Sequence, residues 1–151
     1  MIEKLTVLVV DDTMLMRRIV SNILEEIGIK SIHEADSGTM ALQVITKIPF
    51  DLILMDRKMP GMDGLDCLKE IRFSREYKEQ RDLAVIMVTA ESSKKDIEVG
   101  LNAGADDYIT KPFELEDLKE KILAVVKKKG LDTKYKHKAA SKYSGMSLKL
   151  T

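Results

Sequence analysis

The segment DLILM at residues 51–55 is an almost continuous apolar run of strand length, and it is followed directly by Asp56. A second run of the same kind, LTVLVV at residues 5–10, is followed by Asp11 and Asp12. Strands this apolar must be covered on both faces, which is typical of parallel sheets and not of antiparallel sheets with one wet face. These two runs therefore predict the centre of a parallel β-sheet.

Outward from these two runs, strand-like and helical segments alternate along the chain. The predicted strands are residues 5–10, 31–35, 51–55, 84–89 and 108–109, and the predicted helices are residues 14–27, 39–47, 65–74, 94–103 and 115–128. Because successive β–α–β units join through right-handed crossovers, the helices fall on both sides of one sheet. The pattern predicts an α/β fold, a doubly wound five-stranded parallel sheet with helices on both faces.

Length and composition limit the possible classes of protein. A chain of 151 residues with 44% hydrophobic content fills one ordinary domain. We expect no membrane insertion and a cytoplasmic location, because no apolar run approaches ~20 residues and the N-terminus does not begin like a signal peptide. Cys67 is the only cysteine, which excludes an intramolecular disulfide and a thiolate zinc cluster and suits a reducing compartment.

Charge is strongly segregated along the chain, although the formal net charge is zero. Residues 127–151 carry eight lysines against Asp132, or +7, which leaves residues 1–126 at 17 minus 24, or −7. The helical period ends at Lys128, so we predict a folded domain at residues 1–128 and a basic C-terminal extension at residues 129–151.

Three interpretations of the extension remain open. A flexible solvated end is favoured, and the others are a docking segment for an anionic partner or a linker to an output domain. The sequence argues against nucleic-acid binding, because the extension contains only Tyr135 and Tyr143 as aromatic side chains on which bases could stack.

Chemically active residues follow the predicted strands. Asp11 and Asp12 follow the first strand, Asp56 the third, Thr89 ends the fourth and Lys111 comes after the fifth. In an open parallel sheet the functional crevice lies outside the carboxyl ends of the strands, so these side chains should meet there. Clustered carboxylates repel one another unless a cation joins them, and oxygen ligands of this kind suit Mg²⁺.

The same set of residues fits phosphoryl transfer to a carboxylate, in which catalysis is mainly positioning and charge stabilisation. Asp56, alone at the end of the central run, is the predicted acceptor, while Asp11 and Asp12 are better placed to hold metal. Lys111 would neutralise phosphate oxygens and Thr89 would donate its hydroxyl to one of them. Taken alone, the acidic pair could instead begin the first helix as a cap.

Six motifs, in order and spacing, carry a family resemblance. They are VLVVDD at 7–12, MRRIV at 16–20, MDRKMPGMDG at 55–64, VTAE at 88–91, AGADDY at 103–108 and KPF at 111–113. With them, residues 3–128 resemble the receiver domain of the two-component response regulators, and in particular the CheY-like single-domain chemotaxis regulators. The resemblance implies the (βα)5 flavodoxin-like form of the doubly wound sheet.

The resemblance also implies a function and a ligand set. A sensor histidine kinase would transfer a phosphoryl group to Asp56, and Mg²⁺ would be bound by Asp11, Asp12, Asp56 and the backbone carbonyl of Lys58. The domain would be a signalling protein and not an enzyme, catalysing only its own phosphorylation and dephosphorylation. Its implied partner is a downstream effector such as a flagellar-motor protein, in chemotaxis or motility control.

A switch pair is implied at Thr89 and Tyr108, together with a cis peptide before Pro112. Movement of the Thr89 hydroxyl toward phosphate would let the Tyr108 ring turn inward and change the adjacent surface. The chain departs from the chemotaxis regulators at Lys58, where they have asparagine. We hypothesise that Lys58 pairs with Glu91 or with the phosphate and changes the lifetime of the phosphate.

Two alternatives come from other classes of protein. A haloacid-dehalogenase-type phosphatase also uses a phosphoaspartate and Mg²⁺, but its nucleophile and acid lie two residues apart, whereas Asp11 and Asp12 are adjacent. A nucleotide- or flavin-binding module is disfavoured, because the first strand–helix turn has no glycine-rich cradle and presents carboxylates that repel phosphate.

Overall fold

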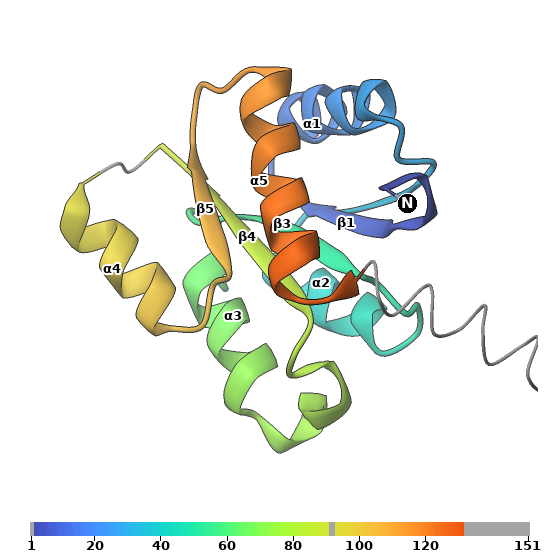
Figure 1. The fold of residues 1–151 in the computed structure, drawn as a ribbon. Coiled ribbons are helices and arrows are strands. Elements are labelled where there is room, and N and C mark those ends of the chain that lie inside the picture. The colour runs from blue at the N-terminus through green and yellow to red at the C-terminus, as the bar shows by residue number, and fades with distance from the viewer. Residues whose placement is uncertain (1, 91–92, 132–151) are drawn as a thin grey trace, which may run out of the picture.

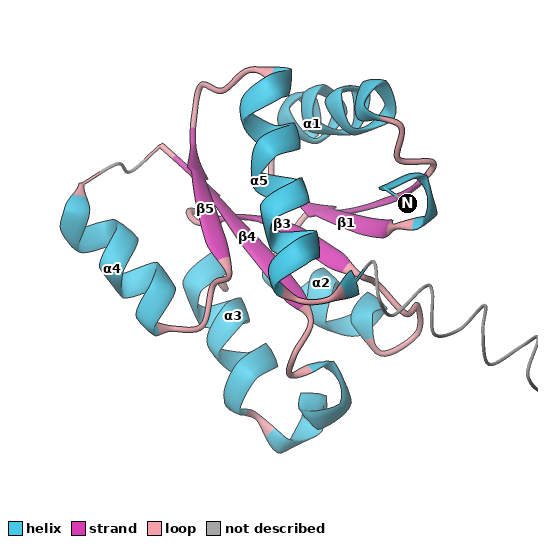
Figure 2. Cartoon of the chain, viewed as in Figure 1, coloured by secondary structure: helices cyan, strands magenta, loops and turns pink. Residues whose placement is uncertain are grey.

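The protein is described by a computed structural model, which covers residues 2–90 and 93–131. Its five strands form one sheet in the order β2-β1-β3-β4-β5, and every neighbouring pair is parallel. Helices lie on both sides of this sheet (Figures 1 and 2). The prediction of a doubly wound parallel sheet is therefore confirmed.

The elements follow the predicted order and differ from the predicted bounds by at most two residues at either end. The strands are β1 (Thr6–Val10), β2 (Ser31–Ala35), β3 (Leu52–Asp56), β4 (Ala84–Thr89) and β5 (Asp107–Thr110). The helices are α1 (Met14–Ile27), α2 (Gly38–Ile45), α3 (Gly64–Phe73), α4 (Lys94–Asn102) and α5 (Leu115–Lys128). The strand β3 includes Asp56 because this residue still pairs with Val88 of β4.

Sequence periodicity missed two short 3₁₀ helices, η1 (Ile2–Lys4) and η2 (Arg75–Gln80). The segment of η2 lies between the helix predicted at residues 65–74 and the strand predicted at residues 84–89, where no element was predicted. The Ser74 hydroxyl accepts a hydrogen bond from the backbone N–H of Glu76, and Tyr77 packs against the core. A 3₁₀ segment of this length carries too few residues to show a period.

The core consists of two apolar layers, one on each face of the sheet. Successive strand residues point to opposite faces, so Leu52 and Leu54 enter one layer while Ile53 and Met55 enter the other. Helices α1 and α5 cover the first layer, and α2 and α3 cover the second (Figure 1). Every residue of β3 is buried, as a strand covered on both faces requires.

Among the described residues, each helix is too short or too polar to cross a membrane.

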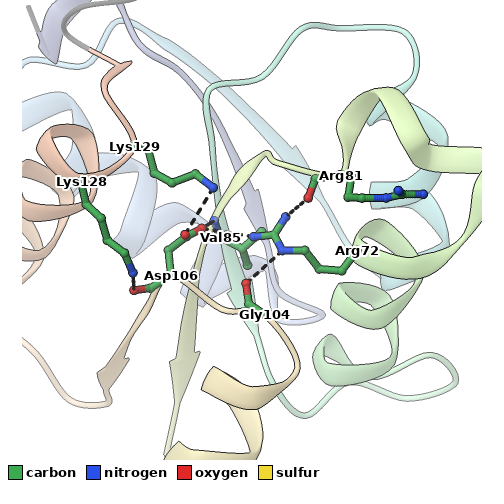
Figure 3. Close-up of polar contacts among 7 residues, drawn as sticks. All are labelled: Arg72, Arg81, Val85, Gly104, Asp106, Lys128 and Lys129. Carbon is green, nitrogen blue, oxygen red and sulfur yellow. Dashed lines mark hydrogen bonds and ion pairs between the residues drawn. The ribbon is translucent and has the colours of Figure 1, made fainter.

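A partly buried ionic cluster lies at the edge of the sheet where β4 and β5 begin (Figure 3). Arg72 of α3 donates to the carbonyls of Gly104 at 2.9 Å and Arg81 at 2.6 Å and pairs with Asp106 at 3.2 Å. Asp106 also accepts from the backbone N–H of Val85 at 2.9 Å. The cluster thereby fastens α3 to β4 and β5 on the side of the sheet away from the acidic strand ends.

The end of α5 joins the same edge. The ammonium of Lys129 lies 3.5 Å from the Asp106 carboxylate, and Leu131 packs in the first apolar layer. The buried core thus continues past Lys128, the predicted end of the domain. The rest of the basic extension, residues 132–151, lies outside the described residues.

We predict opposite effects for alanine at two helical glycines. A Cβ on Gly64 would lie 2.1 Å from the carbonyl oxygen of Asp56, so Gly64→Ala should lower the free energy of unfolding by about 1–3 kcal/mol. At Gly100, in the middle of α4, a Cβ would have no described atom within 4 Å. Gly100→Ala should therefore raise the free energy of unfolding by about 1 kcal/mol. Urea unfolding measures both, and equal effects of the two substitutions would contradict this packing.

Candidate functional site

The predicted site residues meet at the carboxyl edge of the sheet. Asp11 and Asp12 follow β1, Asp56 and Thr89 end β3 and β4, and Lys111 follows β5. They line one pocket of about 260 Å³. Its full lining is Asp11, Asp12, Thr13, Asp56, Lys58, Thr89, Ala90 and Lys111. The structure therefore brings together all the residues predicted to bind metal or to take part in phosphoryl transfer.

Three carboxylates and one ammonium form the centre of the pocket. One oxygen each from Asp11, Asp12 and Asp56 lies within 4.8 Å of the others. Asp11 and Asp56 are buried, and Asp12 is exposed. The Nζ atom of Lys111 lies 3.1 Å from Asp11 Oδ2 and 3.2 Å from Asp56 Oδ1, so it bridges the two buried acids.

Burial and charge act in opposite directions on these groups. Burial raises the pKa of Asp56, Lys111 opposes this shift, and the negative charge of Asp11 adds to it, leaving the pKa above its ordinary value. Burial acts to lower the pKa of Lys111, but the hydrogen bonds and charges of Asp11 and Asp56 outweigh it and raise the pKa. The lysine is thus held as an ammonium, while the Asp56 carboxylate gains from any further cation.

The donor set fits a hard divalent metal such as Mg²⁺. Such an ion takes oxygen ligands at ~2.1 Å in octahedral geometry, so opposite ligands lie about 4.2 Å apart. The three carboxylate oxygens lie within 4.8 Å of one another, which is close to the spacing that a shared metal ion requires. Asp11, Asp12 and Asp56 could therefore hold the metal with waters completing the shell.

Local contacts fix Asp11 in place. Its Oδ1 accepts from the backbone N–H of Thr13 at 2.9 Å, and its carbonyl accepts from Arg17 of α1 at 2.8 Å. Thr13 occupies the N-cap of α1 with no side-chain capping hydrogen bond among the described residues. The alternative that the acidic segment serves only to cap this helix is therefore not supported.

The turn after Asp56 is shaped by Gly64. Its backbone N–H donates to the carbonyl of Arg57 at 2.7 Å, which closes the loop that carries Lys58. Close approach to the Asp56 carbonyl leaves no room for a side chain at Gly64. Sequence analysis gave no role to Gly64, although it ends the motif MDRKMPGMDG. The implied cis peptide between Lys111 and Pro112 is confirmed.

The implied switch pair flanks a second, smaller cavity. Thr89 is buried, and Tyr108 is partly buried with the Lys121 ammonium 5.0 Å from its ring centroid. Both side chains line the cavity between α4 and β5, together with Arg57 and Gly100. Glu91, the suggested partner of Lys58, lies outside the described residues.

Comparison with known proteins identifies the family. The family model described as the response regulator receiver domain matches residues 7–123. The chain belongs to this receiver family. Receiver membership favours Asp56 chemistry over the phosphatase alternative, whose nucleophile would lie at the end of β1.

Several relatives are chemotaxis proteins. The chain is 43% identical over 120 residues to the chemotaxis protein CheY-3 of Vibrio cholerae, covering 80% of this chain and 90% of that protein. It is 42% identical over 116 residues to the chemotaxis protein CheY of Pseudomonas aeruginosa, covering 77% of this chain and 91% of that protein. The solved structure of the Vibrio cholerae chemotaxis protein CheY4 matches this receiver with a TM-score of 0.71 at 33% identity, covering 80% of this chain and 98% of that one.

We predict that Lys111→Met lowers the free energy of unfolding by about 2 kcal/mol in a chelator, because the buried acids lose their shared cation. Mg²⁺ should restore more stability to this variant than to the native receiver, since it replaces that charge. Urea unfolding with chelator or with Mg²⁺ measures both effects. Lys127→Met, at an exposed position on α5, is the control and should change stability by less than about 0.5 kcal/mol. If Lys111→Met in chelator had the same free energy of unfolding as the native receiver, the result would contradict the role of Lys111 as the cation shared by the two acids.

Proposed function

We propose that this receiver is a single-domain response regulator of a two-component phosphorelay, in which Asp56 accepts a phosphoryl group from a sensor histidine kinase. The observation that carries the proposal is the meeting of three carboxylates and the Lys111 ammonium in one pocket at the carboxyl edge of the sheet. A carboxylate is a known nucleophile, and the surrounding charges suit a transferred phosphoryl group.

Each side chain has a distinct part in this transfer. A carboxylate oxygen of Asp56 forms the new bond to phosphorus as the bond to the histidine nitrogen of the donor breaks. Lys111, already within hydrogen-bonding distance of Asp56, exchanges part of that contact for a phosphoryl oxygen. The Thr89 hydroxyl donates to another oxygen, and Asp11 remains fixed by Thr13 and keeps its place beside Lys111.

The metal completes the charge balance. Asp11, Asp12, Asp56 and the backbone carbonyl of Lys58 would hold Mg²⁺, which when bound neutralises charge on the phosphoryl oxygens and on the acids themselves. This ligand set is supported by the spacing of the three carboxylates and by the place of Lys58 in the pocket lining. The domain itself would turn over no substrate beyond its own phosphorylation and dephosphorylation.

The change of surface that partners recognise would begin at the second cavity, which Thr89 and Tyr108 line. Attraction of the Thr89 hydroxyl toward the phosphoryl group frees space beside it, and the Tyr108 ring fills that space, which changes the surface of α4, β5 and α5. The shared cavity lining of Thr89 and Tyr108 supports this coupling. Because the relatives are chemotaxis proteins, the proposed setting is chemotaxis or motility control, with an effector such as a flagellar-motor protein.

Phosphorylation by a small donor tests the central step. The native protein, incubated with acetyl phosphate and Mg²⁺, should carry one phosphoryl group on the peptide that contains Asp56, as read by mass spectrometry. Asp56→Asn should carry none, and chelation of Mg²⁺ should greatly reduce the yield in the native protein. The matched control is Asp66→Asn, an exposed acid in the first turn of α3, which should be labelled like the native chain. Label on Asp11 would favour the phosphatase alternative instead.

The lysine that departs from the family pattern gives a second test. Lys58 lines the phosphoacceptor pocket, so we expect its ammonium to lie near the path by which water approaches a phosphorylated Asp56. Lys58→Asn should speed the loss of phosphate, because it removes a cation that stabilises the anionic group and a bulky side chain at the entrance. Decay of the labelled species, followed over time in both proteins, measures this. Equal decay rates would discard the hypothesis.

A further inference from the structure

Arg57 connects the phosphoacceptor strand to α4. Its backbone N–H donates to the carbonyl of Val88 at 3.1 Å, which continues the pairing of β3 with β4 beyond Asp56. Its guanidinium reaches the first turn of α4, where Nη1 lies 3.3 Å from both the carboxylate and the backbone carbonyl of Asp96. Sequence analysis gave Arg57 no role, because its partner lies 39 residues away.

The partner, Asp96, also shapes the start of α4. Its backbone N–H donates to the hydroxyl of the N-cap residue Ser93, and its carboxylate accepts from the same hydroxyl. The Arg57 and Asp96 side chains are 19% and 29% exposed, so their ion pair is only partly screened by water. Displacement of the first turn of α4 away from β3 would therefore break the ion pair, while the cap would move with the helix.

Helix α4 places no residue of its own in the core, and the buried residues nearest to it, Ala103 and Ala105, follow its C-terminal end. It stands beside β5 at the edge of the molecule (Figure 1), and the structure describes all of its residues without a buried one among them. Helices α1 and α5, in contrast, place Val20, Leu24, Leu118 and Ile122 in the core. Gly100 further weakens α4 internally. One charged contact can thus contribute a large share of the free energy that fixes this helix.

The ion pair also borders the cavity used by the proposed switch. Arg57 and Asp96 line the same cavity as Thr89 and Tyr108. A rearrangement of α4 that lets the Tyr108 ring fill this cavity changes the distance between the first turn of α4 and the end of β3. The ion pair spans that distance.

We propose that the Arg57–Asp96 ion pair is a latch that favours the described packing of α4 and opposes its rearrangement on phosphorylation. This inference rests on the proposed function, because it assigns a regulatory role next to the Asp56 site. Arg57 is a positioning residue, since the contacts described above join it to α4 and to the β4 backbone. Removal of the latch should shift the equilibrium toward the activated packing and so tighten binding of any phosphoryl mimic at Asp56.

Calorimetric titration with beryllofluoride in the presence of Mg²⁺ tests the latch in the full chain. Arg57→Gln and Asp96→Asn should each tighten beryllofluoride binding by about fivefold. Asparagine at position 96 removes the charge while keeping an acceptor for Ser93. The double variant should bind no more tightly than either single variant, because both substitutions break one ion pair. Glu98→Gln removes an exposed charge from the same helix and is the matched control, with native affinity expected.

The outcomes separate the latch from a purely structural role. Unchanged beryllofluoride affinity in both single variants, or independent effects that add in the double variant, would overturn the latch. Urea unfolding in parallel shows whether a variant is folded, and Arg57→Lys should regain most of the native affinity because it keeps the charge. A native protein that binds no beryllofluoride would contradict the proposed function itself and the latch with it.

Discussion

The contact of one lysine with two buried acids underlies the rest of the site. Lys111 lies within 3.2 Å of Asp56 and 3.1 Å of Asp11, so two negative charges that would otherwise repel one another share a cation. Burial makes that cation important, because it raises the cost of the negative charge on Asp56. The same arrangement leaves a net negative pocket, which could hold a metal ion, and it keeps an Asp56 oxygen close to an ammonium.

The two edges of the sheet differ in their contacts, and only one of them carries the acidic pocket. At the edge where β4 and β5 begin, Asp106 and Arg72 bind backbone groups of several elements in a partly buried cluster. At the opposite edge, acidic side chains meet around an open pocket. Two apolar layers connect these edges through fully buried strands, so the positions of the strand ends are well fixed while α4 alone is lightly packed.

Residues around the shared receiver site give this chain its own properties. Lys58 lines the pocket of the three acids, and Arg57, which follows β3, pairs with Asp96 of α4. Both belong to the single loop that Gly64 closes after β3. Under the two proposals above, this short segment beside Asp56 would influence two separate quantities, the lifetime of a phosphoryl group and the equilibrium between packings of α4.

The sequence alone determined the order of the elements, the two covered faces of the sheet and the edge at which Asp11, Asp56 and Lys111 gather. The spacing of apolar residues is a local property of the sequence, and parallel sheets follow general rules of topology. Both can therefore be predicted without a structure. Only the tertiary structure decided that Lys111 bridges Asp11 and Asp56, which lie 100 and 55 residues away in the sequence. It also decided that Arg57 pairs with Asp96. Such pairings depend on how helices settle on the sheet, because side-chain distances of 3 Å follow from packing and not from period.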